Sequence, residues 1–322
     1  MNKICTKDFL PGDILLFKVD VSNPNTEWIS KAIAFLTNSD VSHAALYLGE
    51  NLLSDEGLSG LACHKITDDS ADDPAARPTY VRRLETPIDK GPVLNSAKQY
   101  IKNNEPYDTP ALVLLGLILL YRKFPIHLLP VDFVTKVLAI AAAKIDEYIA
   151  SRLHPGKKPM VCSQYVFQCY EDGGADYQLQ LALRNALPEN SYTLIDHVHK
   201  IVSSAPDQWD SQLQAAITPT DAYDEKYMSE LVEKMKTIDF SQAMPASAVL
   251  DKEIIQSVLH FSSKVYTLFH QDETALTTVE KLSINTDKKA LFVTPADLKL
   301  CTNLNDIGDA ILYRDDEVTE IE

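Results

Sequence analysis

The sequence predicts an α+β protein in which an antiparallel sheet packs on helices and helical insertions interrupt the main domain. Three features of the chain lead to this prediction. The first hundred residues carry strand patterns with one early helix, and from about residue 90 the patterns are helical. Residues 288–304 then return to an apolar strand and a helix start led by proline. Strands, then helices, then a closing strand are typical of the α+β class and not of alternating βαβ units.

The first two elements are marked by the spacing of their apolar residues. GDILLFKV (12–19) is a continuous apolar run and predicts a strand. Residues 26–38 repeat apolar side chains at helical spacing, and Asn25 or Thr26 is the expected N-terminal cap.

A hairpin follows the early helix. Residues 42–57, SHAALYLGENLLSDEG, alternate in a strand-like way on both sides of a predicted turn at Gly49–Asn51. Two further strands, at 61–66 and 79–85, continue the sheet.

Helical patterns dominate after residue 90. The segments 92–104, 110–121 and 131–152 predict helices, and the last two are strongly apolar. Residues 181–287 are acidic, helix-patterned and without a chemical motif. We therefore divide the chain into a main domain with an apolar helical insertion, a helical insertion or subdomain, and a closing segment of the main domain: 1–180 (insertion about 109–158), 181–287 and 288–322.

Composition and charge exclude several classes of protein. The chain of 322 residues has 30 Lys and Arg against 46 Asp and Glu, a net charge of −16. This balance argues against a general nucleic-acid binder and against electrostatic docking on an anionic membrane. The most apolar run, 111–121, is about 16 Å long as a helix, whereas a bilayer needs roughly 20 residues. Without a secretory signal, we expect a protein that is cytoplasmic as synthesised, with export only by a route that reads no such signal.

The five cysteines are predicted to be reduced thiols. They show neither a C-x-x-C pair nor a zinc-like spacing. Cys162 and Cys169 are seven residues apart on one predicted helix, so about 10 Å separates their Cα atoms, too far for a disulfide. The HVH at 197–199 invites a metal interpretation, but helix residues two apart do not face each other. We therefore expect no metal centre and no cofactor.

Cys162 stands where a proline-led loop turns into a helix. In KKPMVCSQYVFQCYEDGG (157–174), Pro159 breaks the preceding segment and Gly173–Gly174 ends the helical pattern. In the first turn of a helix, unpaired N–H groups and the dipole favour thiolate over thiol. Cys162 is therefore the candidate nucleophile. The alternative is a small core residue, which is the role we expect for Cys169.

His43 is the candidate base, and Asp55 is the candidate group that orients it. A thiol nucleophile needs a base within hydrogen-bond reach, and the base needs a third group. His43 and Asp55 flank the hairpin turn on strands about 4.8 Å apart. Glu56 points the opposite way from Asp55, so only one of the two carboxylates can serve, and the register of the turn decides which. His64 is the runner-up base.

The hairpin resembles a known catalytic motif. SHAALYLGENLLSD is similar to the His-containing hairpin of the NlpC superfamily of papain-like cysteine hydrolases, in which a second polar residue follows the His by twelve positions, as Asp55 follows His43. His43 precedes Cys162, the reverse of the papain order, and this matches the circularly permuted branch. The likeness is strongest to the YaeF/YiiX group of permuted papain-like amidases. Four further pieces fit in order: PGDILLF at the start, EPYD at 105–108, VCSQYVFQCY around the thiol and VTPADL at 294–299.

The resemblance implies a permuted papain-like domain that carries out covalent acyl transfer. Cys162 would attack a carbonyl, His43 would move the proton, and Asp55 would hold the imidazole tautomer. Tyr107 would line the cleft. The backbone N–H of Cys162, at the start of a helix, is a natural oxyanion donor.

The expected function is a cysteine hydrolase that cleaves an acyl bond through a thioester. The likeness to amidases slightly favours an amide in a peptide or an acylated amine. A lipid ester is the alternative, with lipid contact through the apolar residues 110–152, and a catalytically inactive binding module is the second alternative. The acidic, insertion-rich build would also suit delivery to another cell by a specialised secretion machine. The expected partner is the substrate, a peptide or a lipid, and the sequence does not tell whether an inhibitor protein binds the chain.

Overall fold

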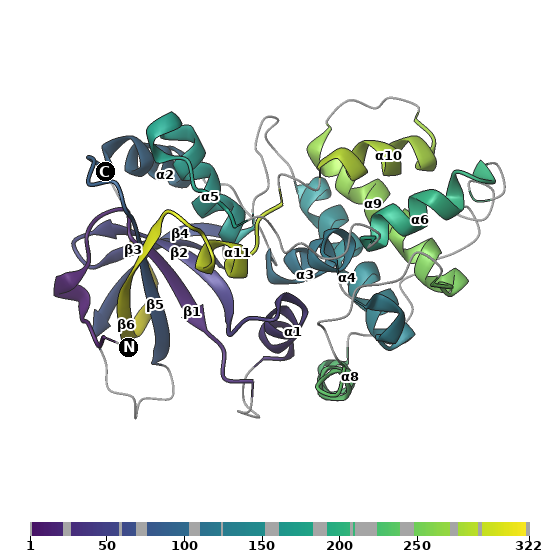
Figure 1. The fold of residues 1–322 in the computed structure, drawn as a ribbon, viewed down its shortest axis with the longest axis horizontal. Coiled ribbons are helices and arrows are strands. Elements are labelled where there is room, and N and C mark those ends of the chain that lie inside the picture. The colour runs from purple at the N-terminus through teal and green to yellow at the C-terminus, as the bar shows by residue number, and fades with distance from the viewer. Residues whose placement is uncertain are drawn as a thin grey trace.

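A computed structural model gives the fold of the chain (Figure 1). The described part is α+β, as predicted, with an antiparallel barrel on one side and a lobe of helices on the other. The structure describes these residues: 2–21, 27–57, 60–68, 76–102, 110–123, 125–151, 161–182, 192–206, 209, 224–238, 248–270, 276–288 and 292–319.

The strands form a closed antiparallel barrel. Its strand order is β1-β2-β3-β4-β6-β5, so the last strand of the chain is inserted between β4 and β5. Both ends of the chain therefore contribute to the same barrel. The strands are β1 (Ile14–Lys18), β2 (Val41–Gly49), β3 (Leu52–Gly57), β4 (Gly60–Asp68), β5 (Arg77–Leu84) and β6 (Leu304–Val318).

The predicted hairpin is confirmed as β2 and β3. Its turn carries three consecutive residues with positive φ: Gly49 at 102°, Glu50 at 53° and Asn51 at 59°. The chain therefore reverses tightly at these residues, and Gly49 has a φ that residues with a side chain rarely adopt. The turn fixes which residues of β2 lie opposite which residues of β3.

The described residues at the start of 288–304 do not form the expected apolar strand. Residues 292–294 are irregular, and residues 289–291 lie outside the described part. Phe292 is buried in the core of the helical lobe, and Val293 is buried under the helices that cover the barrel. The run is apolar because it crosses between two cores. The predicted helix after it is present as α11 (Pro295–Lys299), and β6 follows it.

Three helices cover the outside of the barrel. They are α2 (Gly91–Lys102), α5 (Cys162–Asp172) and α11. Apolar residues of α5 pack with outward-facing residues of β1 and β2 in one cluster, whereas a separate cluster fills the barrel interior. The start of α5 lies at the boundary with the lobe, because Val161 and Cys162 belong to the lobe's core instead.

The lobe joins segments that are far apart in the sequence. Helix α3 packs on α1, α4 and α6, and α4 packs on α9. Every residue from 112 to 121 is buried, so α3 is a core helix of the lobe. The apolar segments 110–121 and 131–151 and the block after residue 181 therefore share one core. The helices of the lobe are α1 (Trp28–Thr37), α3 (Pro110–Tyr121), α4 (Val131–Ser151), α6 (Leu194–Val202), α8 (Glu225–Met235), α9 (Lys252–Phe269) and α10 (Thr278–Lys288).

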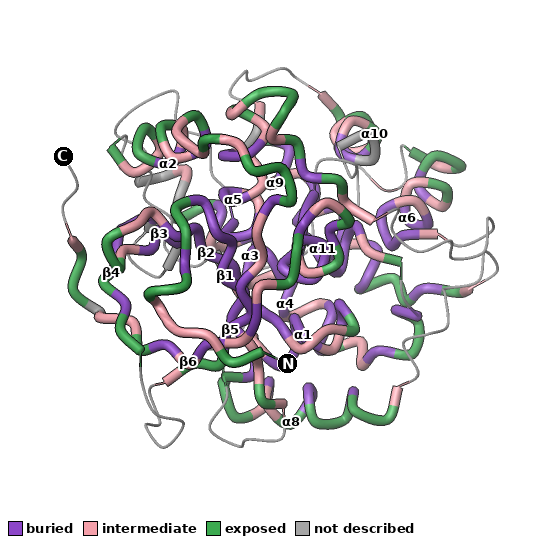
Figure 2. Tube along the Cα trace, turned by 60° about the vertical axis from the view of Figure 1, so that its left-hand side comes forward, coloured by how far each residue is buried: buried purple, intermediate pink, exposed green. Residues whose placement is uncertain are grey.

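Burial follows this division into barrel and lobe. In Figure 2 buried stretches run through the barrel strands and the inner helices, and exposed stretches mark outer turns such as those of α2 and α8. Within the described residues, none of the helices combines the length and the apolar character that crossing a membrane requires.

Candidate active site

Helix α5 begins at Cys162, as the sequence predicts. Val161 before it is extended, with φ −91° and ψ 159°, so the first turn starts abruptly at the cysteine. The hydroxyl of Ser163 donates to the carbonyl of Val293 over 2.8 Å and fixes this turn against the segment before α11. Cys162 is 3% exposed. The backbone N–H groups of Ala44 on β2 and of Ser163 on α5 both lower the pKa of its thiol.

His43 and Asp55 share the inner face of the barrel. The register pairs Ala45 of β2 with Asp55 of β3, and His43 lies two residues before Ala45. Residues two apart on a strand face the same side, so the side chains of His43 and Asp55 meet diagonally. Nε2 of His43 lies 2.8 Å from Oδ2 of Asp55. This register settles the choice that the sequence left open, since Asp55 is the carboxylate beside His43, and the side chain of Glu56 lies outside the described residues.

Cys162 and His43 lie close enough that each shifts the pKa of the other. Because Nε2 of His43 bonds to Asp55, Nδ1 is the ring nitrogen left for the sulfur. Burial would raise the pKa of the Cys162 thiol, but the charge and hydrogen bond of His43 and the two backbone N–H groups lower it. Burial would lower the pKa of His43, but the Cys162 charge and the bonds to Asp55 and Cys162 raise it to about 10. The arrangement therefore favours thiolate and imidazolium over thiol and neutral imidazole.

Cys162 is the cysteine whose pKa is lowered, whereas the pKa of each of the four other cysteines is raised. Burial raises the pKa of Cys63 to about 11, and it raises the pKa of Cys5, Cys169 and Cys301 as well. Cys169 lies in the core between α5 and the barrel, as expected. Burial alone therefore gives an inert thiol in this protein, and the neighbours of Cys162 make the difference.

Asp55 has two further neighbours on its own face of the barrel. Nη1 of Arg314 on β6 donates to Oδ2 of Asp55 over 2.6 Å. Nε2 of His64 on β4 lies 3.6 Å from Oδ1. His64, the runner-up base, thus lies beside the carboxylate, while His43 is the histidine at the thiol. Burial would raise the pKa of Asp55, but His43, Arg314 and His64 lower it to about 2.

Sequence reasoning did not find Arg314. It lies 259 residues from Asp55 on β6, whereas the sequence predicts the closing strand at the start of residues 288–304. Tyr107, predicted to line the cleft, and the rest of EPYD lie outside the described residues.

The HVH motif at 197–199 forms no site. His197 is buried, and its Nε2 donates to the carbonyl of Ala248 over 2.7 Å. Within the ranges that the structure describes, no three His, Cys, Asp or Glu side chains cluster in a way that could hold a metal ion.

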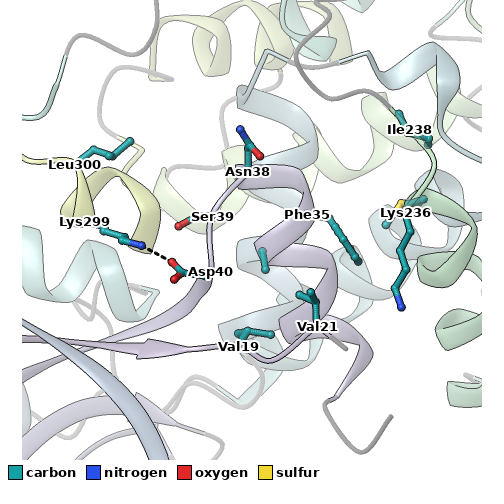
Figure 3. Close-up of a pocket in the computed structure, with 12 residues that line it drawn as sticks. Val19, Val21, Phe35, Asn38, Ser39, Asp40, Lys236, Ile238, Lys299 and Leu300 are labelled. Carbon is teal, nitrogen blue, oxygen red and sulfur yellow. Dashed lines mark hydrogen bonds and ion pairs between the residues drawn. The ribbon is translucent and has the colours of Figure 1, made fainter. Parts of the chain in front are cut away.

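A pocket of about 650 Å³ lies away from the thiol (Figure 3). Its lining comes from residues just after β1, from the end of α1 and the turn that follows it, from the end of α8 and the residues after it, and from the end of α11. Figure 3 shows the ammonium of Lys299 directed at the carboxylate of Asp40, on the same side as Ser39. Neither Cys162 nor His43 lines this pocket, so its size gives it no part in the thiol chemistry.

Comparison with known proteins gives no further assignment. No family model, no curated protein and no solved structure matches the chain. The site must therefore be interpreted from its own geometry.

Proposed function

We propose that the protein is a cysteine hydrolase that cleaves an acyl bond through a thioester intermediate. One observation carries the proposal. A buried thiol at the start of a helix is paired with a histidine, and that histidine is bonded to a buried carboxylate. These are the nucleophile, the base and the orienting group that acyl transfer by a thiol requires.

Each atom of the pair has a role in the reaction. The Cys162 thiolate attacks the carbonyl carbon, and the C=O electron pair moves onto oxygen, which the N–H groups of the first turn of α5 would stabilise. The intermediate collapses as the leaving group takes a proton from Nδ1 of His43, and a thioester remains. Water then attacks the thioester and gives its proton to His43, the acid departs, and the thiolate is restored. Asp55 accepts from Nε2–H throughout and fixes the ring.

The barrel and its covering helix support a permuted papain-like fold as part of the same proposal. The histidine comes from a strand before the cysteine helix in the chain, and α5 lies against that strand. This is the chain order that the sequence resemblance predicts.

An amide is the favoured substrate. The Cys162 charge and the bond to Asp55 keep a proton on His43 in the resting pair. An amine leaves an amide only when it takes up a proton, and this imidazolium holds one beside the thiol. A peptide or an acylated amine is therefore the substrate class that we propose.

A lipid ester is the second candidate, because Cys162 borders a large apolar core. Val161 and Cys162 belong to the same cluster as residues of α1 and α3. An apolar acyl group would meet favourable surroundings on that side of the thiol.

Product analysis separates the candidates. Wild type and Cys162→Ala are incubated with peptides bearing amide bonds and, separately, with phospholipid vesicles, and the products are identified by mass spectrometry. Cleaved amides with wild type alone support the amidase, and fatty acid or lysolipid with wild type alone supports the lipid hydrolase. Equal products from both proteins contradict the role of Cys162, and no product from either protein contradicts the proposal and favours an inactive binding module.

A further inference from the structure

The carboxylate of Asp55 is held by more groups than a cysteine–histidine pair requires. Asp55 is fully buried, yet Oδ2 accepts from His43 over 2.8 Å and from Arg314 over 2.6 Å. A charge-assisted bond from an arginine to a buried carboxylate is among the stronger polar contacts in a protein. The two donors come from opposite ends of the chain and converge on one oxygen atom.

The closure of the barrel places Arg314 there. In the register of β4 and β6, Arg314 lies opposite Ile66, and Ile66 belongs to the apolar cluster inside the barrel. Arg314 therefore points to the inner face, toward Asp55. Its side chain is 25% exposed, and its guanidinium reaches the carboxylate of Asp55.

Several titratable groups face Asp55. His43 approaches Oδ2 from β2, and Arg314 approaches the same oxygen from β6. On β4, Cys63 is near the carboxylate and His64 lies 3.6 Å from Oδ1. Nδ1 of His64 lies 3.0 Å from the carbonyl oxygen of Asp315, which can only accept, so Nδ1 carries a hydrogen. Oδ1 has no hydrogen-bond partner among the described residues, and Arg314 is the permanent cation of the group.

The charges of the active pair balance only when Arg314 is counted. In the reactive form Cys162 and Asp55 are negative, and His43 is positive. These three charges sum to −1, and a net charge inside a protein is costly. Arg314 carries a fixed positive charge and brings the sum to zero. The last strand thus supplies the charge that lets thiolate and carboxylate coexist.

We propose that Arg314 is a positioning residue that keeps Asp55 ionised and sets the proton affinities of both His43 and Cys162. The inference rests on the proposed function, because it concerns the same catalytic pair. Arg314 touches neither the thiol nor a reacting atom, and it acts through Asp55. The group that it contacts is the buried carboxylate of Asp55.

The proposal predicts the direction in which the pKa of Cys162 and the pKa of His43 change in Arg314→Met. Removing a positive charge raises the proton affinity of every group nearby. In Arg314→Met, the pKa of Cys162 and the pKa of His43 therefore both rise. A merely structural loss would loosen the pair, and the two values would then move toward each other, Cys162 upward and His43 downward to its ordinary 6.5. The direction of His43 separates a positioning role from a structural one.

Two measurements on the full chain follow these groups without any turnover. The rate of Cys162 alkylation by iodoacetamide, read by peptide mass spectrometry from pH 4 to pH 9, reports the thiolate. The Cε1–H resonance of ¹³C-labelled histidine, assigned with His43→Ala, reports the imidazolium. We expect the acid limb of alkylation to move up by about one pH unit in Arg314→Met, a tenfold loss of thiolate below the limb. We expect the His43 midpoint to rise as well, and Arg314→Lys to restore part of both.

Arg83→Met is the matched control. Arg83 also donates to a buried carboxylate, that of Asp13, over 2.6 Å, and its side chain is 24% exposed. It thus removes an arginine of the same kind from the same barrel without touching Asp55, and we expect the wild-type profile. If Arg314→Met does not fold, as judged by circular dichroism, Arg314→Gln takes its place.

The outcomes separate this inference from the proposed function. A wild-type Cys162 that titrates as an ordinary thiol would contradict the proposed function itself. A wild-type thiolate with a low pKa, combined with unchanged midpoints in Arg314→Met, would overturn the role of Arg314 alone. A rise of the Cys162 midpoint with a fall of the His43 midpoint would also overturn it, since that is the structural result.

Discussion

His43→Gln is the substitution that most sharply tests the origin of the Cys162 thiolate. Glutamine keeps a polar side chain on β2 but carries no charge. The charge and hydrogen bond of His43 lower the pKa of Cys162 against its burial. Without them burial should dominate, and Cys63 is the benchmark within the same molecule, with a pKa of about 11.

The size of the effect follows from that benchmark. A thiol with a pKa near 11 has about one thiolate in 10⁴ molecules at pH 7. The pKa of wild-type Cys162 lies below the ordinary thiol value of 9.0, so the substitution shifts it by more than two units and lowers the thiolate fraction at pH 7 by at least about 10²-fold. A thiolate of higher pKa is intrinsically more nucleophilic, with a Brønsted slope of about 0.4–0.5, and this recovers roughly tenfold. The net loss of alkylation rate at pH 7 is therefore at least about tenfold.

The assay contains its own controls. Iodoacetamide is added at pH 7, and the modified fraction of each cysteine is followed by peptide mass spectrometry. Cys63, Cys169 and Cys301 are buried free thiols and should react at the same slow rate in both proteins, which checks that the fold is intact. A Cys162 rate that falls less than threefold would refute the view that His43 generates the thiolate.

Three further outcomes test separate contacts. Asp55 has a pKa of about 2 against an ordinary 3.8, so its stabilisation is complete above pH 4 and is lost as the pH falls toward 2. At about 1.4 kcal/mol per pKa unit, the wild type should lose about 2 kcal/mol relative to Asp55→Asn between pH 5 and pH 2 in urea unfolding, and a constant difference would contradict this. Ser163→Ala removes the bond to the carbonyl of Val293 and should lower the free energy of unfolding by about 1–2 kcal/mol, with no change if that bond is unimportant. Gly308→Ala should lower the melting temperature, because Gly308 has φ 149° and a Cβ there would overlap the carbonyl oxygen of Asn2, and a melting temperature equal to that of wild type would show that the N-terminal residues are not held against β6.

Local signals located Cys162, His43 and Asp55 as candidates but did not give their arrangement. Cys162 follows a proline-led loop and starts a helix, and His43 opens a hairpin with a readable turn, so both could be found from short stretches of sequence. Whether Asp55 faces His43 could not be predicted, since a shift of one residue in register moves every side chain to the other face. The pairing of Ala45 with Asp55 supplies that information.

The closing strand shows why the position of β6 and the contact of Arg314 with Asp55 could not be predicted. The apolar run before α11 looks like a strand because Phe292 and Val293 are buried in two different cores. The true strand, β6, is rich in charged residues, and only Gly308, Ala310 and Leu312 reveal a buried face by alternation. The contact of Arg314 with Asp55 spans 259 residues and depends on that strand, so no local pattern could indicate it.

The measurement that tests the central claim most directly is the mass of the acyl-enzyme. The protein is mixed with an activated acyl ester, quenched in acid and analysed as the intact chain and as peptides. We predict one acyl group, on Cys162, that hydroxylamine removes, with none on Cys162→Ala and a much smaller amount on His43→Gln. Acylation of wild type at another residue, or equal acylation of wild type and Cys162→Ala, would contradict the assignment of Cys162 as the nucleophile.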